Sequence, residues 1–198
     1  MKKIYLGSGS IYRAKILEEN GIAFQVKLMP IDEDALNQSV KHTGVSKRFA
    51  KKYGKMLAIE KLKPFVGVIQ DGAVITADSV AWCDGVILEK PITKEKCREQ
   101  HEFISGKKTY ALTSHAVYYN GQVASFVKKS LVGIEKLPSN VLDEICNEPE
   151  TLFCAGYRTG GAIRNYVWWE KGHGNNIRGL DIGIVRRLLK KVGFPDKI

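Results

Sequence analysis

The sequence has few cysteines, prolines and methionines, and it has no long apolar run. Among its 198 residues are four cysteines, six prolines and three methionines. No two cysteines form a C-x-x-C pair, so we expect free thiols in a reducing compartment, without a disulfide framework or structural zinc. No apolar stretch approaches the roughly 20 residues of a membrane helix, and the stretch after Met1 stops at Gly7, too early for a secretion signal. The sequence therefore predicts a soluble, cytoplasmic protein with no membrane partner.

What the chain does have is a globular composition and an excess of positive charge. Hydrophobic residues make up 44% and charged residues 26%, which is typical of a folded protein and not of a disordered one. The length fits a single domain over residues 1–198. The 31 lysines and arginines outnumber 21 acidic residues, for a formal net charge of +10. We therefore expect an anionic partner, either a polynucleotide or the phosphates of a small molecule.

Much of this charge lies in one segment, between Lys41 and Pro64. Apolar residues recur there at spacings near three and four, which predicts an amphipathic helix up to about Leu62. Its basic residues are Lys41, Lys47, Arg48, Lys51, Lys52, Lys55, Lys61 and Lys63, opposed by Glu60. Such a face is either a solvated surface or an anion-binding one, and composition does not decide between them.

Apolar periodicity and turn residues predict an α/β fold with a mixed central sheet and flanking helices. Asp84-Gly85 and Asn120-Gly121 are typical of hairpin turns. Strands are expected at residues 4–6, 22–29, 66–69, 73–82, 86–88, 108–119, 122–134 and 162–170. Helices are expected at residues 11–20, 41–62, 93–104, 139–147 and 182–192, with an acidic loop at 30–38.

Three places have residues suited to chemistry. The segment Ser8–Arg13 is a strand-turn-helix whose free backbone N–H groups are suited to phosphate, although it is no Walker A loop. Asp78 lies in an apolar strand, where it either caps a turn or serves as a metal ligand or general base, with Lys90 nearby in the folded hairpin. The loop Gly172–Leu180 precedes the last helix, and its His173 is either an exposed turn residue or part of an anion- or base-recognition loop.

Nucleophile and histidine-metal motifs are missing from the sequence. It has neither a G-x-S-x-G elbow nor an H-E-x-x-H helix motif. With four histidines in the chain, oxygen ligands for Mg²⁺ or Mn²⁺ are favoured over a histidine-rich metal site.

Taken in order, these places resemble the Maf family, the septum-formation-inhibitor-like nucleotide pyrophosphatases. The matches are collinear and span almost the whole chain. The family patterns and their places here are S-x-S-P-R-R-x-x-L-L at Ser8–Leu17, a D-E loop at Asp32-Glu33, A-x-x-K-A in the region 48–55, G-A-D-[TQ]-V at Thr76–Val80, L-D-G-x-I-L-G-K-P at Cys83–Pro91, L-S-G-R at Ile104–Lys107, C-A-G at Cys154–Gly156 and G-D-x-x-N-V-x-G-L-P at Gly172–Asp181.

This resemblance implies an inosine-triphosphatase-like fold with two lobes around a cleft. It also implies hydrolysis of a nucleoside triphosphate to the monophosphate and pyrophosphate with Mg²⁺ or Mn²⁺, and a homodimer. The catalytic residues it implies are Asp78, as base or metal-linked carboxylate, with Lys90 and Arg13 on phosphate. The metal ligands it implies are Glu33 and Asp78. The substrate-binding residues it implies are Ser8, Ser10, Tyr12, Lys55, Ser79 and Asn176.

The chain departs from the family patterns at several positions. Tyr12 replaces an arginine; a subgroup similar to 7-methyl-GTP pyrophosphatases has Trp there, and an aromatic ring can stack on a cationic base. Ser79 is closer to the dTTP/UTP-like subgroup. Because Tyr12 and Ser79 point to different subgroups, the base preference stays open, and a modified or non-standard base is among the candidates. The other departures are Ile11, Glu89, Gly160, His173 and Asp181. Two alternatives therefore stay open: a catalytically degenerate member of the family, or a basic protein that binds nucleic acid or nucleotides. As a partner, nucleic acid is less expected than a nucleoside triphosphate.

Overall fold

A mixed sheet runs through the molecule. The computed structural model describes residues 2–38, 40–171 and 174–195, in which seven strands are paired in the order β2-β1-β3-β5-β6-β7, with β4 added to β3. The strands are β1 (Lys3–Leu6), β2 (Gln25–Val26), β3 (Gly72–Cys83), β4 (Val86–Leu88), β5 (Lys108–Tyr119), β6 (Gln122–Ile134) and β7 (Val167–Lys171). β1 is parallel to both neighbours, and the pairs from β3 to β7 are antiparallel.

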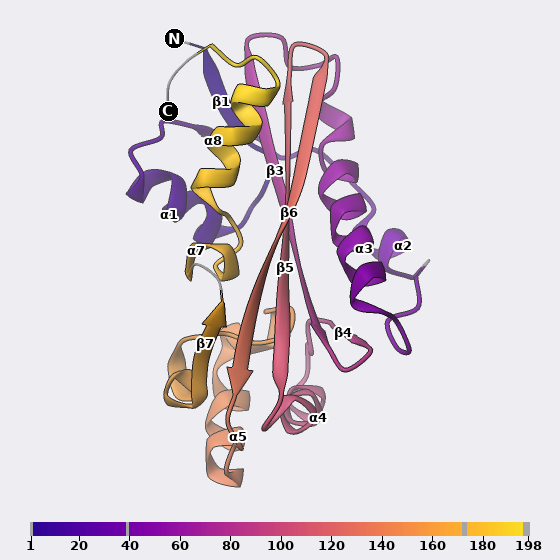
Figure 1. Cartoon of the computed structure of the whole chain (residues 1–198), viewed down its shortest axis with the longest axis vertical. Coiled ribbons are helices and arrows are strands. Elements are labelled where there is room, and N and C mark those ends of the chain that lie inside the picture. The colour runs from indigo at the N-terminus through magenta and orange to yellow at the C-terminus, as the bar shows by residue number, and fades with distance from the viewer. Residues whose placement is uncertain (1, 39, 172–173, 196–198) are drawn as a thin grey trace.

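The helices cover the sheet on both faces. They are α1 (Ile11–Glu19), α2 (Glu33–Gln38), α3 (Lys47–Glu60), α4 (Lys94–Ile104), α5 (Ser139–Asn147), α6 (Pro149–Leu152), α7 (Gly174–Ile177) and α8 (Ile182–Lys191), with 3₁₀ turns at Lys63–Phe65 and Gly161–Tyr166. In Figure 1, the long strands β3, β5 and β6 span the height of the molecule, α1 and α8 lie on one side of its upper half, and α3 lies on the other. α4, α5 and β7 lie in the lower half. The α/β fold with a mixed sheet and flanking helices is confirmed.

In the middle of β3, successive side chains point to opposite faces of the sheet, as the period of two in a strand requires. Thr76 donates a hydrogen bond to the Ala58 carbonyl of α3, 2.7 Å away, and Asp78 also faces the α3 side. Ala77 packs instead into the core shared by α1 and α8. Asp78 and Ser79 therefore lie on opposite faces of the sheet.

Several segments differ from the sequence prediction, and the helix expected at residues 41–62 spans only Lys47–Glu60. Residues 30–38 contain α2, because the Asp32 carboxylate accepts a hydrogen bond from Ala35 N at 2.8 Å and starts the helix. Residues 66–69 are turns and not a strand: Ile69 is buried, while Val66 and Val68 are exposed. Residues 162–170 begin with a 3₁₀ turn, so β7 starts at Val167, and the strand expected at residues 22–29 is reduced to β2.

Among the described residues, no helix is both long and apolar enough to span a bilayer.

Candidate functional site

The turn between β1 and α1 forms one wall of the site. Ser10 is the N-cap of α1, and its hydroxyl accepts a hydrogen bond from Arg13 N. The N-terminus of a helix is suited to an anion. The Ser8 hydroxyl accepts bonds from Ser10 N at 3.3 Å and from Arg13 Nη1 at 2.8 Å. Gly7 precedes them, and a Cβ there would lie 2.8 Å from the Thr76 methyl group. The turn thus sits directly against β3.

Arg13 ties this turn to the start of the C-terminal helix. Its Nε donates to the Gly179 carbonyl at 3.0 Å while Nη1 holds Ser8. Burial lowers the pKa of Arg13, and the neighbouring Asp78 and Glu33 carboxylates oppose that shift. The guanidinium is therefore held in place close to both acidic residues.

Asp78 and Glu33 share one cation, the ammonium of Lys61. Lys61 Nζ lies 2.7 Å from Asp78 Oδ1 and 3.0 Å from Glu33 Oε2. The side chains of Lys61 and Asp78 are 13% and 12% exposed, whereas that of Glu33 is 50% exposed. A pocket of about 110 Å³ opens here, lined in part by Ser8, Gly9, Glu33 and Lys61. The site thus combines a turn at a helix N-terminus, two carboxylates and two cations.

The family resemblance implies a divalent metal ion at Glu33 and Asp78. Carboxylate oxygens are the ligands that Mg²⁺ and Mn²⁺ prefer, and Glu33 and Asp78 do face one point. Lys61 Nζ holds that point, at hydrogen-bonding distance from both carboxylates. With Lys61 in this position, the two residues do not fit a resident divalent ion.

The two lysines expected on phosphate both lie at the surface. Lys55 is exposed on α3, and Lys90 is exposed just after β4. Counted from Ala50, the lysine of the A-x-x-K-A pattern falls on Tyr53, a buried residue whose hydroxyl donates to Asn37 Oδ1. Burial and the nearby carboxylates Asp78, Glu89 and Glu33 raise the pKa of Tyr53 to about 12. The contacts of Lys55 and Lys90 with a substrate stay predictions.

On the other face of β3, a buried network holds the loop before α8. Thr113 Oγ1 donates to the Asn176 carbonyl at 2.6 Å and lies 3.5 Å from the Ser79 hydroxyl. The Asn176 side chain is fully buried and donates to Ser130 Oγ at 2.8 Å. Ser79 also lies close to Gly179, which holds Arg13. Asn176 therefore fastens the loop before α8 to β5 and β6, and its contact with a substrate stays a prediction.

The remaining sequence-predicted residues have different outcomes. Tyr12 is 51% exposed at the start of α1, so its ring is accessible from solvent. Gly172 and His173 lie outside the described residues. Asp181 replaces the proline of the family pattern and caps α8, accepting from Ile184 N at 3.0 Å while Oδ2 pairs with Lys128 at 2.7 Å. That departure has a structural explanation.

The four cysteines are free, as the sequence predicts. The structure nevertheless brings together Cys97, His101 and Cys146, whose candidate ligand atoms lie within 4.8 Å of one another. Burial raises the pKa of both thiols, and His101 Nδ1 is 2.8 Å from the Cys97 carbonyl. The cluster as folded is one of protonated thiols beside a histidine already hydrogen-bonded to the backbone.

Lys61 is the residue that the sequence reasoning missed. It was one of eight lysines and arginines in a basic segment, and nothing in its local sequence singles it out. Its position at the end of the expected helix is the one available signal, because the dipole of a helix favours a cation at the C-cap. Only the packing of α3 on β3 shows that this cation meets Asp78.

Comparison with known proteins adds the family context. A family model described as Maf-like protein matches residues 3–192. A dTTP/UTP pyrophosphatase from Pyrococcus abyssi is 30% identical over 197 residues, covering 98% of this chain and 98% of the relative. A dTTP/UTP pyrophosphatase from Halalkalibacterium halodurans is 28% identical over 198 residues, with full coverage of both.

Two further similarities are more distant. A nucleoside triphosphate pyrophosphatase from Corynebacterium glutamicum is 26% identical over 193 residues, covering 97% of this chain and 95% of the relative. Among solved structures, a HAM1 protein from Coxiella burnetii aligns over 95% of this chain and 91% of its own, at 13% identity and a TM-score of 0.37.

Proposed function

Because the chain belongs to the Maf-like protein family, we propose that it hydrolyses a nucleoside triphosphate to the monophosphate and pyrophosphate. The names of the full-length relatives support this reaction. The observation that carries the proposal is the meeting of Asp78 with Lys61 and Arg13 beside the β1–α1 turn, next to a pocket that this turn and Lys61 line in part. Hydrolysis of a polyanion needs these parts: groups that hold phosphate and a carboxylate that directs water.

In the proposed reaction, the chain of phosphates lies across the β1–α1 turn. The backbone N–H groups of the turn and the Arg13 guanidinium hold phosphate oxygens. Asp78 orients a water molecule and takes its proton as the water oxygen attacks the α-phosphorus. The bond from that phosphorus to the bridging oxygen of the β-phosphate breaks, and pyrophosphate leaves with the electron pair. Lys61 and Arg13 balance the negative charge that builds up on the phosphate oxygens.

A divalent cation remains part of the proposal as a companion of the substrate. Mg²⁺ or Mn²⁺ bound to the nucleotide would supply positive charge to the phosphates that Arg13 and the β1–α1 turn hold. Such an ion enters and leaves with the nucleotide, so it needs no resident site between Glu33 and Asp78.

The base that the enzyme accepts is a separate part of the proposal. We place the base near Tyr12, whose exposed ring at the start of α1 is accessible for stacking. A methylated, positively charged base would gain about 0.5–2 kcal/mol from that ring. The dTTP/UTP pyrophosphatases among the relatives make a pyrimidine nucleotide the first candidate. A panel of canonical, methylated and deaminated triphosphates, with pyrophosphate as the readout, ranks these substrates.

The test of the reaction is Asp78→Asn. The amide keeps the size of the carboxylate but takes no proton, so we expect kcat to fall by about a hundredfold or more. Asp84→Asn is the matched control, because Asp84 is an exposed residue of the β3–β4 turn, with φ 42°, a backbone conformation that Asn tolerates. Undiminished turnover in Asp78→Asn, with a melting temperature like that of the control, would show that Asp78 is not the base.

A wild-type protein that binds nucleotides but turns over none of the panel would instead favour a catalytically degenerate member of the family.

The homodimer that the family resemblance implies also stays a prediction, which light scattering on the purified protein tests. The cytoplasmic location expected from the sequence is likewise a prediction.

A further inference from the structure

The point between Glu33 and Asp78 is the most strongly charged position in the described site. Two carboxylate oxygens from different elements, α2 and β3, lie within 3.0 Å of a single nitrogen, Lys61 Nζ. Two acidic oxygens that face one point commonly mark a divalent cation site. Here the side chain at that point is a lysine supplied by the end of α3.

Several features hold Lys61 there. Its side chain is 13% exposed, so most of it is out of contact with water. Lys61 is the C-cap of α3, and its backbone N–H bonds to carbonyls of that helix. The carbonyl end of a helix attracts positive charge. The ammonium is therefore bound by two carboxylates and favoured by the helix on which it stands.

The charge balance of the site is also complete without a metal ion. Arg13 and Lys61 carry two positive charges, and Glu33 and Asp78 carry two negative charges. Arg13 is close enough to both carboxylates for them to act on its pKa. A divalent ion added at this point would meet two cations and would have to displace the Lys61 ammonium before it reached either oxygen.

We propose that Lys61 is the built-in cation of this site: its ammonium occupies the position of a divalent ion between Glu33 and Asp78 and excludes one. The proposal concerns the free protein and does not depend on the reaction proposed above. The protein without nucleotide then has no tight divalent site at Asp78, and removal of the lysine ammonium creates one.

The test measures Mn²⁺ binding to the protein without nucleotide. Electron paramagnetic resonance reports the concentration of free Mn²⁺ at each point of the titration. We expect Lys61→Met to bind one Mn²⁺ at least ten times more tightly than the wild type does. The matched control is Lys63→Met, because Lys63 is an exposed lysine nearby that pairs with Glu60. This variant is expected to match the wild type. Adding Glu33→Gln to Lys61→Met is expected to remove the new site.

A second readout guards against misfolding of the methionine variant. Lys61→Gln keeps a hydrogen-bond donor for the carboxylates, and its melting temperature is measured with and without Mn²⁺. A ligand that binds only the folded state raises the melting temperature, so we expect Mn²⁺ to stabilise both Lys61 variants and not the wild type. The proposal is overturned if the wild type binds Mn²⁺ as tightly as Lys61→Met and loses it in Glu33→Gln, or if neither Lys61 variant binds it.

Discussion

At the scale of single residues, buried polar groups explain one departure from the family patterns. Asp181 stands where the pattern has proline, and its backbone N–H donates to His115 Nε2 at 2.8 Å. Its carboxylate caps α8 and pairs with Lys128. A proline at this position would have no N–H to donate. The aspartate therefore fits a hydrogen-bond pattern in which His115 must be a neutral acceptor.

His115 makes the stability of the fold depend on pH. Burial lowers the pKa of His115 to about 4, with Asp181 acting in the opposite direction. The unfolded chain takes up a proton below the ordinary pKa of 6.5, while the folded protein does so only near 4. The free energy of unfolding is therefore expected to be full above pH 6.5 and to fall as the pH drops toward 4, by up to about 3 kcal/mol.

His115→Gln tests this effect, because a glutamine oxygen still accepts the bond from Asp181 N but does not titrate. We expect urea unfolding of this variant to show a shallower loss of stability between pH 6.5 and pH 4 than the wild type shows. Equal slopes in the two proteins would assign the acid sensitivity to other groups, such as His101, whose pKa burial also lowers.

At the scale of elements, the β1–α1 turn depends on how closely it approaches β3. A Cβ on Gly7 would lie 2.8 Å from the Thr76 methyl group and 3.0 Å from the Phe65 ring. Both neighbours are buried, so the turn must shift to admit the methyl group. We expect Gly7→Ala to lower the free energy of unfolding by about 1–3 kcal/mol and to raise KM, because Ser8 and Ser10 move with the turn.

Gly9→Ala is the matched control from the same turn. A Cβ on Gly9 would meet the Leu28 side chain at 3.8 Å, an ordinary contact. Melting temperature and steady-state kinetics compare the two variants. If Gly9→Ala harms the enzyme as much as Gly7→Ala does, the turn is sensitive to lost flexibility and not to the contact with Thr76.

The elements that the sequence predicts best are those with local signals. α1 and α4 begin about where expected, with Ser10 and Thr93 as their N-caps, and Asn120-Gly121 turns β5 into β6. Local signals fail where the packing of distant segments decides. The apolar residues 66–69 read as a strand, yet Ile69 fills the core beneath α3 without pairing in the sheet. Likewise Asp78 stands out in its strand, but its partner Lys61 depends on where α3 ends.

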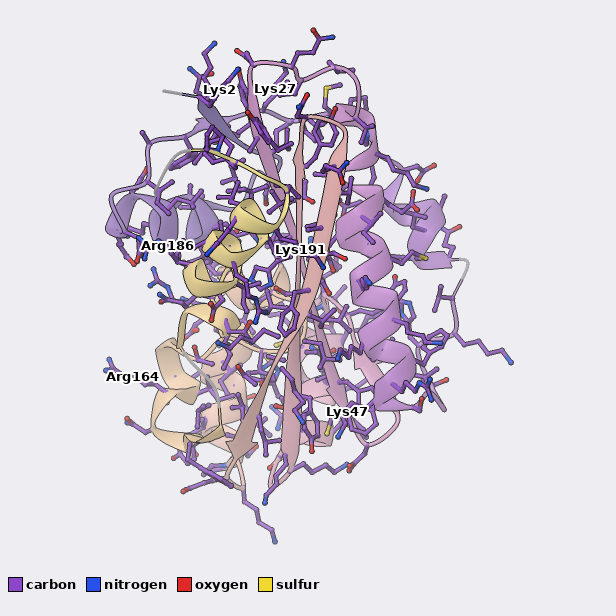
Figure 2. All side chains as sticks on the ribbon, turned by 45° about the horizontal axis from the view of Figure 1, so that its top comes forward. Lys2, Lys27, Lys47, Arg164, Arg186 and Lys191 are labelled. Atoms are coloured by element: carbon purple, nitrogen blue, oxygen red, sulfur yellow. The ribbon has the colours of Figure 1, made fainter. Side chains whose placement is uncertain are left out.

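At the scale of the whole molecule, the excess positive charge is distributed over many elements. The basic side chains labelled in Figure 2 project from widely separated parts of the protein, and they are Lys2, Lys27, Lys47, Arg164, Arg186 and Lys191. Within the basic segment 41–64, Lys61 contacts Asp78, Lys63 pairs with Glu60 and Lys47 lies over the Tyr110 ring. Such a distribution is more typical of a general positive field than of a single track for a polynucleotide.

This field is expected to draw the triphosphate to the site, and salt tests it. Raising the ionic strength from about 0.02 M to about 0.2 M shortens the Debye length from roughly 20 Å to roughly 7 Å. We expect kcat/KM to fall by roughly threefold or more, because capture of a polyanion by a protein of net charge +10 weakens. At saturating nucleotide, kcat is expected to change little, since the bound phosphates are held by Arg13 and the β1–α1 turn. A flat kcat/KM over this range would mean that the charge outside the site plays no part in capture. An oligonucleotide titrated over the same salt series, with nanomolar affinity and a steep slope, would instead identify a polynucleotide as the partner of this charge.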